Sequence, residues 1–183
     1  EILSIDEVLA GFDGFAESTD HAEFFWMPHT SNALLKRNTR TTEAPPPARN
    51  ARHAMKRRWK RFKNQELLEN VAFGALNHLG RLRPALIPRL NGQVLADAGR
   101  AEYLTTSYDV FTSSRRVRFY EMEYAVPRQH GLEAFRRVQA LIDTLDRPIS
   151  FPIEFRVLGG DANRTAASLA HVTSAGPGTE RLI

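Results

Sequence analysis

Residues 151 to 157, which read FPIEFRV, constrain the fold more than any other stretch because apolar side chains occupy every second position. The apolar row is Phe151, Ile153, Phe155 and Val157. Successive side chains of a β-strand point to opposite faces, so the pattern predicts a strand over residues 150–158 with one face buried against helices. Glu154 and Arg156 then share the opposite face, an acid beside a base. From the residues alone, this pair fits either a solvent-facing ion pair or two groups that a reaction needs.

Three further segments have the composition of strands. The string HAEFFWMPHT at residues 21–30 combines aromatic residues with a turn signal and predicts a buried strand. Residues 33–41, ALLKRNTRT, predict a second strand after that turn. Residues 117–127, VRFYEMEYAVP, alternate between two rows and predict a strand that ends at Pro127.

Helical patterns separate these strands. Ser4 and Glu7 form the sequence signature of a capping box, and an apolar helical stripe follows from Ile5 onward. Residues 64–80 predict a second helix, and residues 130–146 predict a third, strongly amphipathic one. Each of these helices has one apolar face that can cover a sheet.

The order of elements predicts the fold class. Strands joined by helical excursions indicate an α+β fold, with a mainly antiparallel sheet covered by helices. Prolines interrupt residues 81–91, so we expect irregular structure or a short turn of helix there. Residues 101–114 are expected to form a loop. A chain of 183 residues is long enough for one domain with a substantial core, and we expect a single domain over residues 1–183.

The positive charge is concentrated in one segment. Residues 52–63, RHAMKRRWKRFK, contain seven of the 25 Lys and Arg residues and no acid, which leaves 18 basic against 21 acidic residues elsewhere, a net charge of −3. Met55, Trp59 and Phe62 lie on one helical face. We expect a helix seated through that face with its charges in solvent, and no nucleic-acid partner. A nucleic-acid-binding module that uses this basic helix is the alternative.

Other candidate sites are less informative. The six histidines lack the spacing of metal ligands, so no metal site is expected. The chain contains neither the G-x-G-x-x-G string nor a P-loop, so nothing in it predicts a dinucleotide cradle. Glu121 and Glu123 share one face of the strand predicted at residues 117–127, where they contact either solvent or basic residues of a neighbouring strand.

Three strings, EFFWMPHT, EMEYAVPR and FPIEFRV, occur in an order and spacing that resemble the aldonolactone oxidoreductase family. This family comprises the L-gulono-, L-galactono- and D-arabinono-1,4-lactone oxidases and dehydrogenases, relatives of the alditol oxidases in the vanillyl-alcohol-oxidase class of flavoproteins. The resemblance covers about residues 1–160. It implies that the chain is the C-terminal substrate-binding cap domain of an FAD-dependent enzyme, whose FAD-binding domain is absent from this chain.

The resemblance also implies roles for individual residues. In the family an acid-x-arginine pair on a cap strand faces the flavin, and Glu154 and Arg156 match that pair as catalytic residues. The reaction is the oxidation of a CH–OH group of a sugar 1,4-lactone, with hydride transfer to flavin N5. Glu154 is expected to hold the substrate hydroxyl and Arg156 to stabilise negative charge on oxygen. His171 and Thr173 resemble a substrate-contacting His-x-Thr of the alditol oxidases.

The chain also departs from the family pattern. It lacks the His-Trp-x-Lys motif near the family's C-terminus as well as the domain that holds FAD, so we expect a piece of an enzyme that is inactive alone. Its expected partners are the lactone, an N-terminal FAD-binding domain, and oxygen or a cytochrome as electron acceptor. No apolar run approaches the roughly 20 residues of a membrane span. We expect a cytoplasmic location and leave membrane association open.

Overall fold

The structure is a computed structural model, and it describes residues 1–44, 52, 55, 73–98, 100–111, 120–158 and 181–182. Within these residues the regular elements follow one another as β1 (Ile2–Ser4), α1 (Ile5–Ser18), β2 (His21–Trp26), β3 (Asn32–Asn38), α3 (Phe73–Leu82), the 3-10 helix η2 (Pro84–Leu86), α4 (Ile87–Ala98), α5 (Ser107–Phe111), β4 (Val126–Pro127), α6 (Arg128–Asp143), β5 (Ile153–Leu158) and β6 (Arg181–Leu182).

The chain forms two compact units. The first contains the described strands together with α1, α4 and α6, and consists of residues 1–40, 85–100 and 121–183. The second contains α3 and α5, and consists of residues 41–84 and 101–120. Strand β5, which carries the acid–base pair of the FPIEFRV string, belongs to the first unit.

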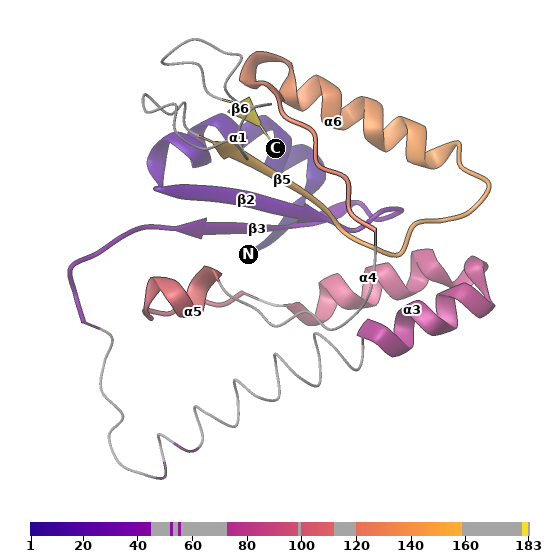
Figure 1. Cartoon of the computed structure of the whole chain (residues 1–183), viewed down its shortest axis with the longest axis horizontal. Helices are drawn as coiled ribbons and strands as arrows, with labels where there is room; N and C mark the ends of the chain where they lie inside the picture. Colours follow the sequence, from indigo (N-terminus) through magenta and orange to yellow (C-terminus); the bar gives the residue numbers. More distant parts are fainter. Residues whose placement is uncertain are drawn as a thin grey trace. The chain divides into compact units, whose positions relative to one another are not determined.

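The sheet of the first unit places β5 in its interior. Within the described residues six strands are ordered β1-β3-β2-β5-β6-β4, and all neighbouring strands are antiparallel. Strand β5 therefore has β2 along one edge and β6 along the other (Figure 1). The register pairs Phe24 with Phe155 and Glu23 with Arg156. The predicted α+β class, an antiparallel sheet with helices, is confirmed.

Helix α1 begins where the capping box predicts. The Ser4 hydroxyl accepts a hydrogen bond from the Glu7 backbone N–H at 3.2 Å, and the Glu7 carboxylate accepts one from the Ser4 backbone N–H at 3.0 Å. These bonds satisfy donors that the first turn of a helix leaves without partners. The Ser4 hydroxyl also donates to Glu7 Oε2 at 2.6 Å. This bond, followed by the one from the Ser4 backbone N–H, lowers the pKa of Glu7 because both favour the charged carboxylate.

One face of the sheet packs on α1 and α6 through aromatic rings (Figure 1). The ring of Phe24 on β2 stacks on Phe155 of β5 with centroids 4.9 Å apart. Phe12 of α1 and Phe135 of α6 meet this pair edge-on, at 5.2 Å and 5.0 Å from Phe24. Phe155 is 7% exposed, and Ile153 and Val157 pack beside it. The strand predicted over residues 150–158 is thus confirmed for Ile153–Leu158, and its buried face for Ile153, Phe155 and Val157, whereas Phe151 precedes the strand.

The strand predicted over residues 117–127 is wrong for the part that the structure describes. Residues 120–125 have no regular structure, and only Val126–Pro127 pair as β4, with β6. The short strand ends at Pro127, as predicted. Strand β6 pairs with β5 only at Val157 and Leu158, and among the described residues the segment 121–125 forms no ladder with the rest of β5.

Helices occur in two stretches for which a loop, or at most a short turn of helix, was expected. Helix α4 begins at Ile87 and continues through Ala98, with Pro88 in its first turn. Proline is tolerated there because the first N–H groups of a helix have no intrahelical acceptor. The short helix α5 covers Ser107–Phe111.

Most of the basic segment 52–63 lies outside the described residues. Arg52 and Met55 are helical, in agreement with the predicted helix, but Met55 is 70% exposed although we expected it on the seated face. Trp59 and Phe62 are not described, so the amphipathic helix and its nucleic-acid alternative stay predictions. Among the helices of the described residues, none combines the length and apolar character that a membrane span requires.

Candidate functional site

The acid and the base of β5 lie together on the face of the sheet opposite the aromatic core. The Arg156 Nη1 donates to Glu154 Oε1 at 3.0 Å. The side chain of Glu154 is 29% exposed and that of Arg156 is 39% exposed, so both are half-buried. The pair is therefore formed, ordered along the strand, and still reachable from one side.

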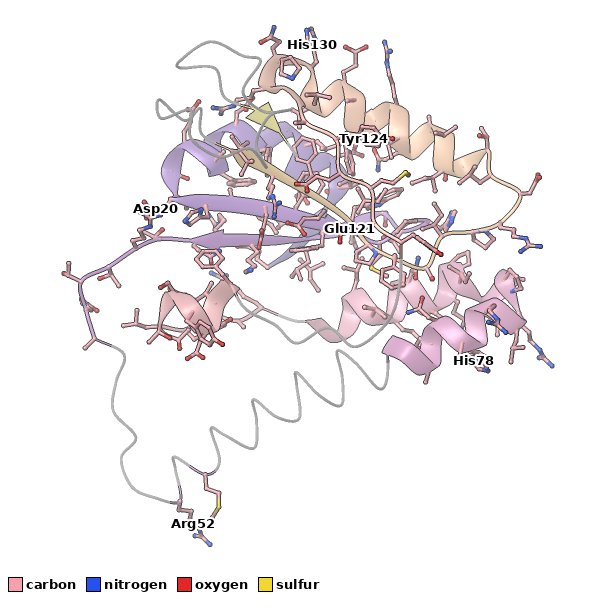
Figure 2. The ribbon with its side chains drawn as sticks, in the orientation of Figure 1. Asp20, Arg52, His78, Glu121, Tyr124 and His130 are labelled. Atoms are coloured by element: carbon pink, nitrogen blue, oxygen red, sulfur yellow. The ribbon has the colours of Figure 1, made fainter. Side chains whose placement is uncertain are left out.

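A second carboxylate approaches Arg156 from outside the sheet. The Arg156 Nη2 donates to Glu123 Oε1 at 3.0 Å, and the Glu123 side chain is 55% exposed. Glu123 belongs to the irregular segment 121–125, which runs past the sheet (Figure 2). In the figure this segment can be followed from Glu121 to Tyr124. Of the two alternatives for Glu123, solvent or a basic residue of a neighbouring strand, the structure shows the basic partner Arg156, although the segment of Glu123 is not a strand.

Two further charges extend this face across the neighbouring strands. Lys36 on β3 donates from Nζ to Glu23 Oε1 on β2 at 2.6 Å. Cross-strand register places Glu23 opposite Lys36 on one side and opposite Arg156 on the other. The row Lys36, Glu23, Arg156 therefore crosses three adjacent strands at one level, next to Glu154.

Not every donor on this face is used. Among the described residues, the buried Nε of Arg156 and the buried Nδ2 of Asn38 have no hydrogen-bond acceptor. Asn38 lies at the end of β3, opposite His21. An N–H that is removed from water and lacks an acceptor is costly, roughly 1–3 kcal/mol.

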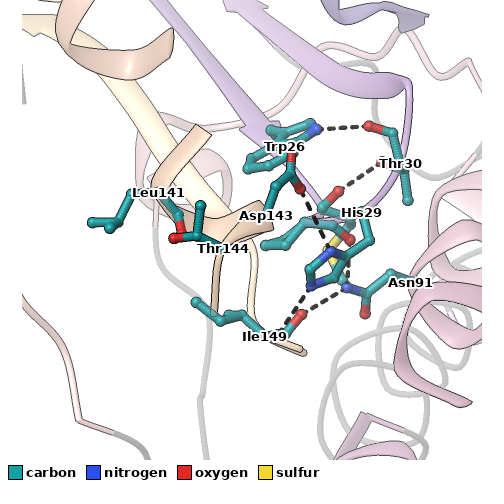
Figure 3. A network of polar contacts seen from close by, with 10 residues as sticks. Trp26, His29, Thr30, Asn91, Leu141, Asp143, Thr144 and Ile149 are labelled. Atoms are coloured by element: carbon teal, nitrogen blue, oxygen red, sulfur yellow. Dashed lines mark hydrogen bonds and ion pairs between the residues drawn. The ribbon is translucent and has the colours of Figure 1, made fainter. Parts of the chain in front are cut away.

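The approach to β5 is anchored by the turn between β2 and β3 (Figure 3). The buried side chain of Asn91 on α4 donates to the carbonyl oxygens of Pro28 and Ile149, at 2.9 Å and 3.0 Å. His29, whose φ is 66°, accepts from the Ile149 backbone N–H through Nε2 at 3.2 Å. Both contacts join the turn to the residues that lead into β5. They therefore help to fix the position at which β5, the strand of Glu154, begins.

The positions of the predicted site residues can be compared with this geometry. Glu154 and Arg156 are brought together as a pair, whereas His171 and Thr173 lie outside the described residues. Lys36 and Glu23 were not singled out from the sequence. The signal for Glu23 was present, because it is a single acid on the non-core row of an aromatic strand, opposite the row of Phe24.

Comparison with known proteins places the chain in a family. The sequence model of the D-arabinono-1,4-lactone oxidase family matches residues 1–175. The chain belongs to this family. Its members are aldonolactone oxidoreductases and are generally flavin-dependent.

The similarity extends to individual members of the D-arabinono-1,4-lactone oxidase family. The chain is 35% identical to L-gulono-1,4-lactone dehydrogenase of Mycobacterium tuberculosis strain H37Rv over 158 aligned residues. The aligned region covers 86% of this chain and 35% of the relative. It is 24% identical over 161 residues to L-gulonolactone oxidase of Bos taurus, covering 86% of this chain and 34% of the relative. The chain thus spans about a third of the length of these curated relatives.

Proposed function

We propose that this chain is the substrate-binding cap region of an FAD-dependent oxidoreductase that oxidises a CH–OH group of a sugar 1,4-lactone. Family membership supports the reaction class. The observation that carries the proposal is the ion pair of Glu154 and Arg156 on the half-exposed face of an interior strand. A sheet face with its core on one side and reachable charges on the other is suited to present those charges to a substrate.

The residues of this face fit a site next to a flavin. Arg156 is a fixed cation with one N–H that lacks an acceptor among the described residues, and a carboxylate lies beside it. Such a donor set suits the oxygen atoms of a lactone. It would also suit the negative charge that a flavin gains when it is reduced. The bound flavin supplies the hydride acceptor, N5. We propose that an N-terminal domain outside this chain holds FAD, and that this chain alone neither retains the flavin nor oxidises lactone.

Glu154 is assigned to the substrate hydroxyl. Its carboxylate can accept a hydrogen bond from the O–H of the carbon that loses hydride, and can take the proton as the carbonyl forms. The contact with Arg156 Nη1 at 3.0 Å orients this carboxylate along the strand face. Positioned proton transfer of this kind contributes roughly 10²–10⁴-fold to a rate.

Arg156 is assigned to the charge that develops on oxygen. Guanidinium stays cationic at every pH at which proteins work, and its planar fork orients two acceptors at once. Its location beside Glu154 puts the cation next to the oxygen whose proton is removed. His171 and Thr173 are proposed as further substrate contacts on the strength of the family resemblance, and oxygen or a cytochrome as the electron acceptor.

The test uses the full-length protein and the substitution Glu154→Gln. We expect turnover with L-gulono- or D-arabinono-1,4-lactone to fall by about 10²-fold or more, while the flavin absorbance and the thermal midpoint remain those of the parent protein. Anaerobic bleaching of the flavin by lactone measures the chemical step directly. Arg156→Lys should also be impaired, since a point charge cannot reproduce the planar fork.

Glu123→Gln is the matched control. It removes the other carboxylate bound to Arg156, from an exposed position outside the sheet. We expect its turnover to stay within about threefold of the parent value, as for a surface ion pair of low energy. If Glu154→Gln and Glu123→Gln lower turnover equally, Glu154 is only a counter-ion of Arg156 and the proton-accepting role is rejected. Full turnover in Glu154→Gln rejects the site altogether.

A further inference from the structure

Glu23 lies between two cations and contacts only one of them. Its backbone position is opposite Lys36 on β3 and opposite Arg156 on β5. Side chains directly opposite in antiparallel strands have Cβ atoms about 4.5–5.5 Å apart, so both cations are within reach. The Glu23 carboxylate is nevertheless bound by Lys36 at 2.6 Å and forms no ion pair with Arg156.

Arg156 meanwhile retains an unmatched donor on the same face. Its Nη1 and Nη2 are taken by Glu154 and Glu123, and its Nε is buried without an acceptor among the described residues. The side chain of Glu23 is 15% exposed, so its charge is poorly solvated and requires a partner. Without Lys36, that carboxylate would have Arg156 as its remaining cation in register.

We infer that Lys36 is a positioning residue that holds Glu23 away from Arg156 and so keeps the guanidinium, whose side chain is 39% exposed, for a substrate oxygen. This inference rests on the proposed function, because it assigns the Arg156 guanidinium to the lactone. A carboxylate binds guanidinium through two parallel hydrogen bonds in preference to one. A released Glu23 carboxylate therefore competes for the donors that the lactone oxygen needs.

The predicted consequence is an activity loss that a second substitution repairs. In the full-length protein, Lys36→Met should lower kcat for lactone at least tenfold with a smaller change in KM, because Arg156 acts on charge that develops during the reaction. Glu23→Gln alone should stay within threefold of the parent, since a neutral amide neither needs Lys36 nor captures Arg156. The double variant Lys36→Met with Glu23→Gln should return to within threefold of Glu23→Gln.

The measurements are kcat and KM with L-gulono- and D-arabinono-1,4-lactone, together with flavin absorbance and the thermal midpoint of each variant. Lys36→Gln is the second single variant in case Lys36→Met does not fold, because it removes the counter-ion of Glu23 while keeping a polar side chain. Recovery of kcat in the double variant supports the inference. If Lys36 were needed only for folding or for binding the lactone, the further substitution of Glu23 would not restore kcat.

Three results overturn the inference. Unchanged kcat in Lys36→Met shows that Glu23 does not capture Arg156. A double variant as impaired as the single one shows that Lys36 acts on the lactone or on folding. Wild-type turnover in both Glu154→Gln and Arg156→Lys removes the proposed function and the inference together. Impaired Glu154→Gln with active Lys36→Met removes only the inference, so the two failures are distinguishable.

Discussion

Replacing Asn91 by aspartate should destabilise the protein more than replacing it by alanine, although aspartate is nearly isosteric with asparagine. Asn91 is 2% exposed, and its amide nitrogen donates to the Pro28 and Ile149 carbonyl oxygens at 2.9 Å and 3.0 Å. Two carbonyl oxygens on one side require a donor between them. The amide orientation follows from this, since its own oxygen would repel both (Figure 3).

The magnitude follows from these two bonds. Asn91→Ala leaves two carbonyls without a donor, and each costs roughly 1–3 kcal/mol when water cannot replace it. The Pro28 carbonyl is in the buried bond, whereas the Ile149 bond is only part-buried and can recover some of its loss from solvent. Alanine also favours a helix by about 0.5 kcal/mol over asparagine. We therefore expect a loss of roughly 2–3 kcal/mol from a total of about 5–15 kcal/mol.

Asn91→Asp should cost more than that at neutral pH. The introduced carboxylate faces two carbonyl oxygens and is shielded from water, so its pKa in the folded state is raised above the unfolded value. The folded state then binds more protons than the unfolded state, and the free energy of unfolding of this variant increases as pH falls. At low pH the protonated acid can donate one of the two lost hydrogen bonds.

Urea unfolding of the parent and variants, followed at several pH values, measures these differences. Gln93→Ala is the matched control, because Gln93 is an exposed residue of the same helix and its replacement should change stability by less than about 0.5 kcal/mol. If Asn91→Asp is as stable as the parent, or more stable than Asn91→Ala at neutral pH, then the amide does not donate to these carbonyls and the reasoning fails.

Two other changes test the support of the site. Phe155→Ala should lower the free energy of unfolding by roughly 3–5 kcal/mol, because it empties the centre of the ring cluster behind Glu154; a loss below 1 kcal/mol in urea unfolding would contradict the packing described. Ser4→Ala should cost about 1 kcal/mol through loss of the helix cap. Because the pKa of Glu7 is lowered in the folded state, its stabilising contribution is full above the ordinary glutamate pKa and is lost as pH falls through the folded value. The difference between parent and Ser4→Ala should therefore shrink in acid, and a gap that is constant with pH argues against the Glu7 contact.

Local patterns in the sequence determined the start of α1 and the two faces of β5. The Ser4–Glu7 capping box requires only residues within one helical turn, so its outcome was predictable from four adjacent positions. The alternation around Phe155 likewise assigned Glu154 and Arg156 to one face, because the strand period is a property of the backbone itself. These local patterns contributed to the predicted α+β fold class and identified Glu154 and Arg156 as the candidate pair.

Only the tertiary structure decided which groups surround that pair. The register of β2 and β3 beside β5 places Glu23 between Lys36 and Arg156, and nothing within a single strand specifies its neighbours or their register. The same limit explains the error at residues 120–125, whose alternation was real but which pair with no strand among the described residues. Asn91 was missed for a related reason, since the carbonyls that hold it are 63 and 58 residues away in sequence. Alternation and capping are local, whereas pairing depends on which distant segments the folded chain brings together.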